Sequence, residues 1–329
     1  MQALKLAQVD GRLTPVLDEQ YPPPQAGPGE VVLRPLRMGV CSTDLELCKG
    51  YMGYQGVLGH EFVAIVESAA DDAGRRWIGK RVVGTINCPT AECEFTRAGI
   101  PEHARSRTVL GILGRDGCFA DRFTLPAANL LEVPDHVDDD HAVFAEPLAA
   151  AFEITTQIDV PVDAMVTVLG DGRLGLLCAQ VLKLVNPHVR VVGKHAEKLA
   201  LCEKWDIAAR PLADVGLRQD QDIVVDATGS PTGVITAMQM LRPRGTLVLK
   251  STYSPTSAGA DKVDLAPIVI NELTVIGSRC GPFAKALDAL GADRVDVVSL
   301  IGRRMKLSAG VELLKAARKP GVIKVLLEP

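Results

Sequence analysis

A short stretch of the chain, residues 41–61, gathers side chains of the types that bind and use a metal ion. It begins at Cys41 and ends at His60 and Glu61, and so offers a thiolate, an imidazole and a carboxylate. A catalytic zinc needs three protein ligands of N, S or O type and one open position. A distant carboxylate, Glu146, is the further candidate ligand. Cys41 or His60 alone would indicate an ordinary buried residue, but their combination favours a metal site.

A glycine-rich turn is the second feature with a chemical meaning. It follows a continuous apolar run at 165–169 and precedes an amphipathic segment. Between a strand and a helix, Gly-x-Gly-x-x-Gly is a dinucleotide-binding pattern, because the glycines allow a tight turn and the helix N-terminus attracts the pyrophosphate. Asp171 lies inside the turn, and we expect its side chain to point away from the phosphates. The predicted cofactor-binding residues here are Gly170, Gly172, Arg173, Leu174 and Gly175.

The residues after the second predicted strand favour NADP over NAD. An NAD-binding fold needs an acidic residue there to accept a hydrogen bond from the ribose 2′-hydroxyl. This chain has Gly193 followed by Lys194 and His195, which leaves space and two basic side chains for a 2′-phosphate. NAD is the alternative, with Lys194 as a plain surface residue and Glu197 as a substitute acid.

The elements that must position these residues show two different sequence patterns. The first part of the chain has short strands between Gly/Pro turns, at 30–36, 62–67 and 81–86, which is typical of a β-rich domain. From 165 onward, short apolar strands alternate with helices, which indicates a parallel sheet with right-handed crossovers. Helical spacing predicts further helices over 142–156 and 197–205.

Four motifs in this order resemble the zinc-dependent medium-chain dehydrogenase/reductase family of alcohol and polyol dehydrogenases. They are Cys-x-Thr-Asp at 41–44, Gly-His-Glu at 59–61, Glu-Pro-Leu at 146–148 and the glycine-rich turn. The resemblance covers nearly the whole chain and implies an α/β fold. It implies a discontinuous GroES-like catalytic domain, 1–144 and 280–329, and a Rossmann doubly wound parallel sheet, 145–279.

The resemblance also implies a ligand set. Cys41, His60 and Glu146 would be the direct ligands of one catalytic zinc, with Glu61 an exchangeable carboxylate beside them. A carboxylate at 146, where many relatives have cysteine, is similar to the polyol dehydrogenase branch. Such a harder ligand leaves more positive charge on the metal.

Three further residues near Cys41 have implied roles. Thr43 resembles the hydroxyl that binds the substrate oxygen and starts a proton relay. Asp44 would fix the tautomer of His60, a role compatible with capping the helix after Cys41. Glu46 stands where several relatives have a histidine, and either ends the relay or is a solvated surface charge.

Thr228 and Arg279 lie in two segments that resemble those passing the nicotinamide in this family. Their roles are left open.

Many relatives carry a second, structural zinc held by four cysteines in one loop. The corresponding positions in this chain are Thr90, Cys93, Thr96 and Ala104, and one thiolate cannot close a tetrahedral site. We therefore expect one zinc, not two. A different metal site formed by Cys88, Cys93 and His103 is an alternative, but the spacing of these residues matches no common zinc-binding pattern.

Composition excludes several classes of function. A net charge of −4 and 4% aromatic residues argue against nucleic acid as a partner. No apolar run approaches the roughly 18 residues of a membrane span, and the N-terminus has no signal-peptide core. Eight scattered cysteines do not indicate a disulfide scaffold, so a reduced, cytoplasmic enzyme is expected.

The sequence therefore predicts a zinc-dependent, NADP-preferring dehydrogenase of small-molecule alcohols, with polyol, cyclitol or sugar substrates favoured. By resemblance it would be a homodimer or homotetramer. Two alternatives stay open: a zinc-free quinone or enoyl reductase of the same superfamily, and a dinucleotide-binding protein without catalysis.

Overall fold

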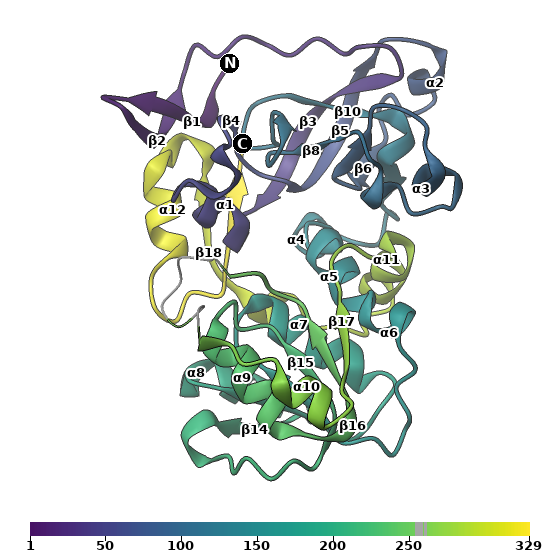
Figure 1. Ribbon diagram of the computed structural model, residues 1–329. Coiled ribbons are helices and arrows are strands. Elements are labelled where there is room, and N and C mark those ends of the chain that lie inside the picture. Colours follow the sequence, from purple (N-terminus) through teal and green to yellow (C-terminus); the bar gives the residue numbers. More distant parts are fainter. Residues whose placement is uncertain (254–258, 260–261) are drawn as a thin grey trace. The chain divides into compact units, whose positions relative to one another are not determined.

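The computed structural model describes residues 1–253, 259 and 262–329, which fold into two compact units (Figure 1). Unit 1 comprises Met1–Glu146, Ala286–Ala292 and Leu300–Pro329, and unit 2 comprises Pro147–Lys285 and Asp293–Ser299. The chain thus leaves unit 1 at 146/147, close to the domain limit of 144/145 expected from the sequence. It returns to unit 1 in two segments, Ala286–Ala292 and Leu300–Pro329, whereas the sequence predicts a single limit at 279/280.

Unit 1 is organised around a largely antiparallel sheet, which has seven strands within the described residues. Its central strand β3 pairs with three neighbours, β5, β10 and β19. The strands are Glu30–Gly39 (β3), Glu61–Ala69 (β5), Arg81–Gly84 (β6), Phe123–Pro126 (β10), Leu130–Glu132 (β11), Ile301–Lys306 (β18) and Lys324–Glu328 (β19). Two small sheets complete it: Ala3–Val9 (β1), Arg12–Asp18 (β2) and Gly56–Val57 (β4), and Asn87–Pro89 (β7), Arg107–Leu110 (β8) and Gly114–Arg115 (β9).

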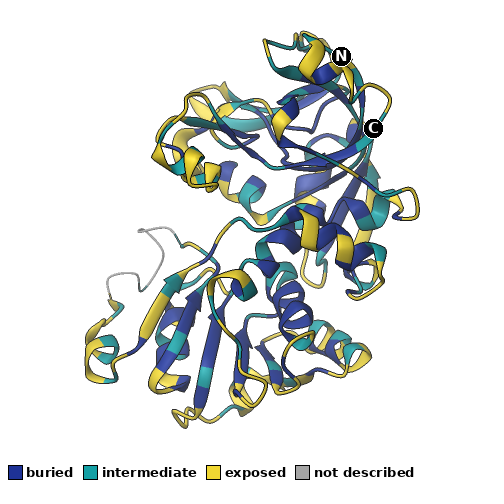
Figure 2. Ribbon diagram, turned by 90° about the vertical axis from the view of Figure 1, so that its right-hand side faces the viewer, coloured by how far each residue is buried: buried dark blue, intermediate teal, exposed yellow. Residues whose placement is uncertain are grey.

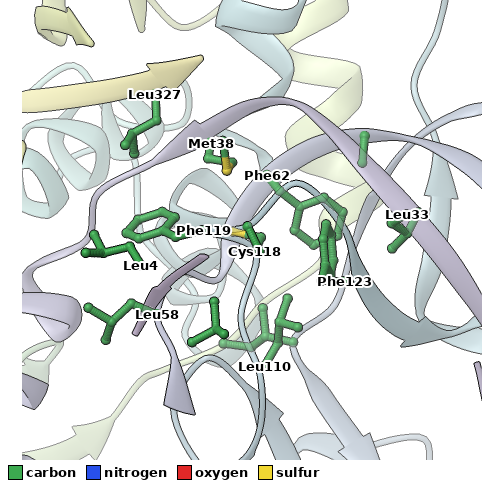
Figure 3. Close-up of a cluster of buried hydrophobic side chains, with 14 of the residues drawn as sticks. Leu4, Leu33, Met38, Leu58, Phe62, Leu110, Cys118, Phe119, Phe123 and Leu327 are labelled. Atoms are coloured by element: carbon green, nitrogen blue, oxygen red, sulfur yellow. The ribbon is translucent and has the colours of Figure 1, made fainter. Parts of the chain in front are cut away.

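An apolar core joins these sheets within unit 1 (Figure 3). The rings of Phe62 and Phe123 meet edge to face, with centroids 4.8 Å apart. Phe119 is fully buried beside Leu4 and Leu58. Because β5 contributes Phe62 to this core, the residues just before it on the same strand are held in a fixed place.

Unit 2 contains a parallel sheet, six-stranded in its described part, in the order β14-β13-β12-β15-β16-β17. The chain starts in the middle, moves to one edge and then crosses to the other, which is the doubly wound order that the resemblance predicted. The α/β fold class is confirmed. The strands are Val166–Leu169 (β12), Val189–Gly193 (β13), Ala208–Pro211 (β14), Gln221–Asp226 (β15), Leu241–Leu249 (β16) and Thr274–Gly277 (β17).

Short helices accompany both sheets. In unit 1 they are Ser42–Leu47 (α1), Asp72–Arg75 (α2), Glu94–Arg97 (α3), Asp139–Ala142 (α4) and Val311–Ala317 (α12). In unit 2 they include Ile154–Gln157 (α6), Arg173–Lys183 (α7), Ala196–Leu199 (α8), Pro231–Met240 (α9) and Ala266–Ile270 (α10). Two helices, Ala145–Phe152 (α5) and Phe283–Gly291 (α11), include residues of both units.

Two helix predictions are wrong in their extent. The helix expected over 142–156 is three pieces, α4, α5 and α6. Pro147 lacks an N–H and fits only the first turn of a helix, so a new helix must begin just before it. The helix expected over 197–205 is α-helical only as far as Leu199 and continues as a 3₁₀ turn to Trp205.

The edge strands β14 and β17 contain no buried residue, whereas the strands β12, β13 and β15 between them are mostly buried, as the colours of Figure 2 indicate for the middle of the sheet. Continuous burial of this kind is expected where helices cover both faces of a parallel sheet. Among the described residues, the longest apolar helices fall short of the length that a bilayer crossing requires.

Candidate functional site

Cys41, His60 and Glu61 converge in unit 1. The Cys41 Sγ, a ring nitrogen of His60 and a carboxylate oxygen of Glu61 all lie within 4.8 Å of one another. His60 and Glu61 are buried and Cys41 is partly exposed. Zinc binds these atom types at about 2.0–2.3 Å, so the three donors need to move little to share one ion. The donor chemistry therefore fits zinc.

Local structure explains this convergence. Cys41 follows the end of β3 and is the N-cap of α1, while Glu61 opens β5 and pairs with Gly39 of β3. Gly59, just before His60, has a φ of +96°, which glycine adopts readily. A Cβ atom there would lie 2.2 Å from the Phe119 ring. A glycine at this position thus lets the loop lie against the core and turn His60 toward Cys41.

Asp44 ties the two ligand-bearing segments together. Its carboxylate accepts hydrogen bonds from the backbone N–H of Cys41, at 2.8 Å, and of Gly59, at 3.1 Å. Its Oδ1 also lies 3.5 Å from His60 Nδ1. Burial opposes the charged form of His60, but the negative groups of Asp44 and Cys41 outweigh it and raise the pKa of His60 well above its usual value.

A buried lysine accompanies Glu61. Lys324, at the start of β19, forms an ion pair with the Glu61 carboxylate, and both side chains are fully buried. The Lys324 ammonium also lies 5.4 Å from the centre of the Phe144 ring. Burial lowers the pKa of Lys324 to about 8, against the raising influence of Cys41 and Asp44. Sequence reasoning missed this residue, although a lysine within the apolar run Val322 to Leu327 is a signal of a buried partner.

The other residues predicted for this site are placed differently. The Thr43 hydroxyl lies 3.6 Å from the Cys41 sulfur. Glu46 is exposed on α1 and pairs with Lys49 at 2.6 Å, which is the geometry of a surface charge. Glu146 is partly buried on α5 and is not part of the three-residue cluster. The structure therefore brings together three of the four predicted metal ligands.

The lobe at 88–107 is held by hydrogen bonds. Thr96 Oγ1 accepts from the Cys93 N–H and donates to the Cys93 carbonyl, both at 2.8 Å. Within the described residues, Cys88, Cys93 and His103 do not gather into a group of potential metal ligands.

In unit 2, the glycine-rich turn joins β12 to α7. Gly170 has a φ of +116°, and a Cβ atom at Gly175 would lie 2.0 Å from the Gly170 carbonyl oxygen. Gly172 is the N-cap of α7, and nothing lies within 4 Å of where its Cβ would be. Arg173 and Leu174 form the first turn of this helix. The open space in front of the backbone fits the close approach of a pyrophosphate.

The Asp171 side chain points toward the end of β13. Its Oδ2 accepts from the backbone N–H of Lys194, at 2.7 Å, and of His195, at 2.6 Å. Its Oδ1 lies 2.9 Å from His195 Nδ1. A Cβ atom at Gly193 would approach Asp171 Oδ2 to 2.4 Å. The Lys194 and His195 side chains themselves are exposed.

Thr228 and Arg279 follow β15 and β17, at the carboxyl edge of the same sheet, where ligands bind in folds of this kind. The Thr228 hydroxyl donates to Asp226 at 2.7 Å. Lys250, which the sequence analysis did not single out, donates to the Ser278 hydroxyl at 3.0 Å and to the Arg279 carbonyl at 3.3 Å. A lysine at the end of an apolar strand was the available signal.

The comparisons with known proteins agree with this architecture. The alcohol dehydrogenase GroES-like domain family matches residues 27–135, and the zinc-binding dehydrogenase family matches residues 174–293. The chain is 30% identical over 275 residues to an L-threonine 3-dehydrogenase of Streptomyces avermitilis, covering 78% of each chain. It is 28% identical over 295 residues to an erythritol/L-threitol dehydrogenase of Mycolicibacterium smegmatis, covering 80% of each.

A solved structure from Sinorhizobium meliloti 1021, bound to NADP, is similar over its whole length. Its TM-score is 0.87 at 25% identity, with 100% of this chain and 99% of that chain covered.

Proposed function

The chain belongs to the zinc-dependent medium-chain dehydrogenase/reductase family, and from this premise we propose that it interconverts a polyol, cyclitol or sugar and the matching carbonyl compound with NADP. That it is an NAD(P)-dependent alcohol oxidoreductase follows from the family. The convergence of Cys41, His60 and Glu61 carries the proposal, because it supplies the donors that a catalytic zinc needs.

In this proposal Cys41 and His60 hold the zinc, and Glu146 completes the ligand set by resemblance. Glu61 is the exchangeable carboxylate, and its ion pair with Lys324 gives it a partner when it is not on the metal. Asp44 keeps the segments of Cys41 and Gly59 at a fixed separation through its two hydrogen bonds.

When bound, zinc polarises the substrate oxygen and the nicotinamide carries the hydride. Thr43 lies beside the Cys41 sulfur, so its Oγ1 can accept the proton of the substrate hydroxyl as it passes its own proton to water. The exposed pair of Glu46 and Lys49 favours a relay that continues through water over one that ends on Glu46.

The choice of NADP rests on Gly193, Lys194 and His195. Gly193 has no room for the acidic side chain that NAD-binding folds use, since Asp171 fills that space. Lys194 and His195 are exposed directly after it. Erythritol or L-threitol is the substrate named for one relative, which supports the polyol class for this chain.

We also propose a homodimer, which could pair further into a homotetramer. Within the described residues β17 is the last strand of its sheet, and its Val275 is 39% exposed. Next to it in sequence, Val269 and Ile270 of α10 are 79% and 77% exposed. An uncovered apolar edge of this kind favours association with a second copy.

A substrate panel with metal analysis tests the function. Polyols, amino-alcohols and aldehydes are assayed with NADP and NAD, and zinc is quantified per chain. We expect turnover of a polyol with NADP and about one zinc per chain. Cys41→Ser should lose both the zinc and the turnover, whereas Cys48→Ser, a matched thiol at the end of α1, should keep them. Turnover of the wild type in the absence of zinc would point instead to a quinone or enoyl reductase.

A further inference from the structure

The glycine-rich turn contains a carboxylate that serves the neighbouring loop. Asp171 is 6% exposed and is surrounded by donors from the segment after β13. Two of these donors are backbone N–H groups, those of Lys194 and His195, and the third is His195 Nδ1. The Asp171 side chain therefore accepts all its hydrogen bonds from Lys194 and His195, the two basic residues that are candidates for binding a 2′-phosphate.

The Asp171 side chain can take this position only because residue 193 is a glycine. A Cβ at 193 would lie 2.4 Å from the Asp171 Oδ2 and 2.5 Å from its Cβ, which leaves no space for a side chain there. The carboxylate thus occupies the region where an acid on β13 would stand. Because the Asp171 oxygens accept hydrogen bonds from residues 194 and 195, the side chain is placed to orient this segment instead of the cofactor.

The contact fixes the state of the His195 ring. With Nδ1 donating to Asp171, the other ring nitrogen, Nε2, is left for a partner outside the pair. The His195 side chain is 45% exposed, so an anion can reach it. Burial raises the pKa of Asp171, but hydrogen bonds from the His195 side chain and from the backbone of His195 and Lys194 outweigh it and lower the pKa overall. The group therefore remains a carboxylate and can accept the Nδ1 hydrogen bond.

We propose that Asp171 is a positioning residue for NADP: it holds His195 with Nδ1–H on the carboxylate, so that the ring presents Nε2 to the adenosine 2′-phosphate. Its two backbone bonds fix the start of the same segment, from which the exposed Lys194 side chain extends. This inference rests on the proposed NADP preference and assigns its structural cause.

The test compares dissociation constants for NADPH and NADH in four proteins. They are the wild type, Asp171→Asn, His195→Gln and the double variant. Asparagine keeps one oxygen for the backbone N–H groups but places an NH₂ group where Oδ1 faces His195 Nδ1 at 2.9 Å. We expect Asp171→Asn to weaken NADPH about tenfold and to leave NADH nearly unchanged. If Asp171 acts through His195, it should add little in the His195→Gln background.

A spectroscopic readout separates positioning from general loss of structure. In ¹⁵N-histidine-labelled wild type, NADPH should shift the His195 Nε2 resonance while Nδ1 stays protonated, and in Asp171→Asn the Nδ1 resonance should change. Asp222→Asn is the matched control, because Asp222 also accepts a backbone N–H of unit 2, from Met165 at 2.7 Å, at the start of β12. It should leave the NADPH-to-NADH ratio unaltered.

The outcomes are distinct. If Asp171→Asn weakens NADH as much as NADPH, or weakens NADPH equally in the His195→Gln background, the positioning role is overturned. A wild type that binds NADH better than NADPH refutes the proposed cofactor choice itself, whatever the variants do.

Discussion

The Lys324 side chain carries its charge into the interior of unit 1, where it meets the Glu61 carboxylate. Neither side chain has any exposed surface, so water cannot solvate either charge. Such a pair adds little net stability, but removal of one partner leaves the other charge buried and uncompensated. Gly39 leaves the space for both, since a Cβ there would lie 2.4 Å from Glu61 Oε2 and 2.7 Å from Lys324 Nζ.

Lys324→Met should therefore lower the free energy of unfolding by about 3–5 kcal/mol. The double variant Glu61→Gln/Lys324→Met should recover much of this loss, because neither member of the pair then leaves an uncompensated charge. Urea unfolding of zinc-free protein measures both. Lys80→Met is the control: Lys80 pairs with Glu132 at 2.6 Å with both side chains largely exposed, so its loss should stay below about 1 kcal/mol. Equal losses at the two lysines would contradict the argument.

The sequence indicates which side chains lie close together where the partners belong to one short segment. Cys41, His60 and Glu61 were chosen by type and spacing, and the structure brings them together. The sequence does not indicate the role of Lys324, because its partner Glu61 is far away in the sequence. The two are brought together only through the pairing of β19 with β3. The direction of Asp171 away from the turn was expected, but its partners after β13 follow from the parallel register of β12 and β13, which the sequence does not show.

At the scale of elements, the turn between β12 and α7 needs glycines for two separate reasons. Gly175 lies where α7 meets the preceding loop so closely that a Cβ would overlap the Gly170 carbonyl. Gly172 has open space around it and a φ of −77°, which any residue can adopt. The first glycine is required by packing, whereas the second leaves room for a ligand.

Gly175→Ala and Gly172→Ala should thus have opposite effects. Gly175→Ala should destabilise the cofactor-free protein by about 1–3 kcal/mol, because α7 must move away from β12. Gly172→Ala should leave the melting temperature unchanged or slightly higher, since alanine restricts the unfolded chain. It should nevertheless weaken NADPH about tenfold, because its methyl group fills the space for the pyrophosphate. Thermal melts and NADPH titrations of both variants provide the check, and a stable Gly175→Ala protein would refute the packing argument.

Element-scale prediction succeeded for the buried strands of unit 2, because valine-rich runs such as Val189–Gly193, interrupted only by Arg190, have few alternatives. It failed where local chemistry competed with periodicity. Pro147 divides one predicted helix. The strand β16 begins at Leu241, before its apolar run, and the polar segment with Pro243 and Gly245 gives no sign of a strand in the sequence.

At the scale of the whole molecule, unit 2 has an exposed apolar edge whose extent the composition alone does not show. Val269, Ile270 and Val275 have the composition of a core, and only the fold leaves them uncovered. Within the part of the chain that the structure describes, the doubly wound order places β17 last in the sheet, where another strand can pair with it.

Charged side chains at this edge should separate the proposed dimer. Val269→Glu/Ile270→Glu introduces like charges on both copies of a self-complementary surface, where their burial is costly. Light scattering with size-exclusion chromatography should show the mass falling by half, with the melting curve of the chain retained. Val162→Glu, a change at a valine of unit 2 that is 65% exposed, should leave the mass unaltered. If the double variant keeps the mass of the wild type, or if the wild type is already a monomer, this edge is not the contact between copies.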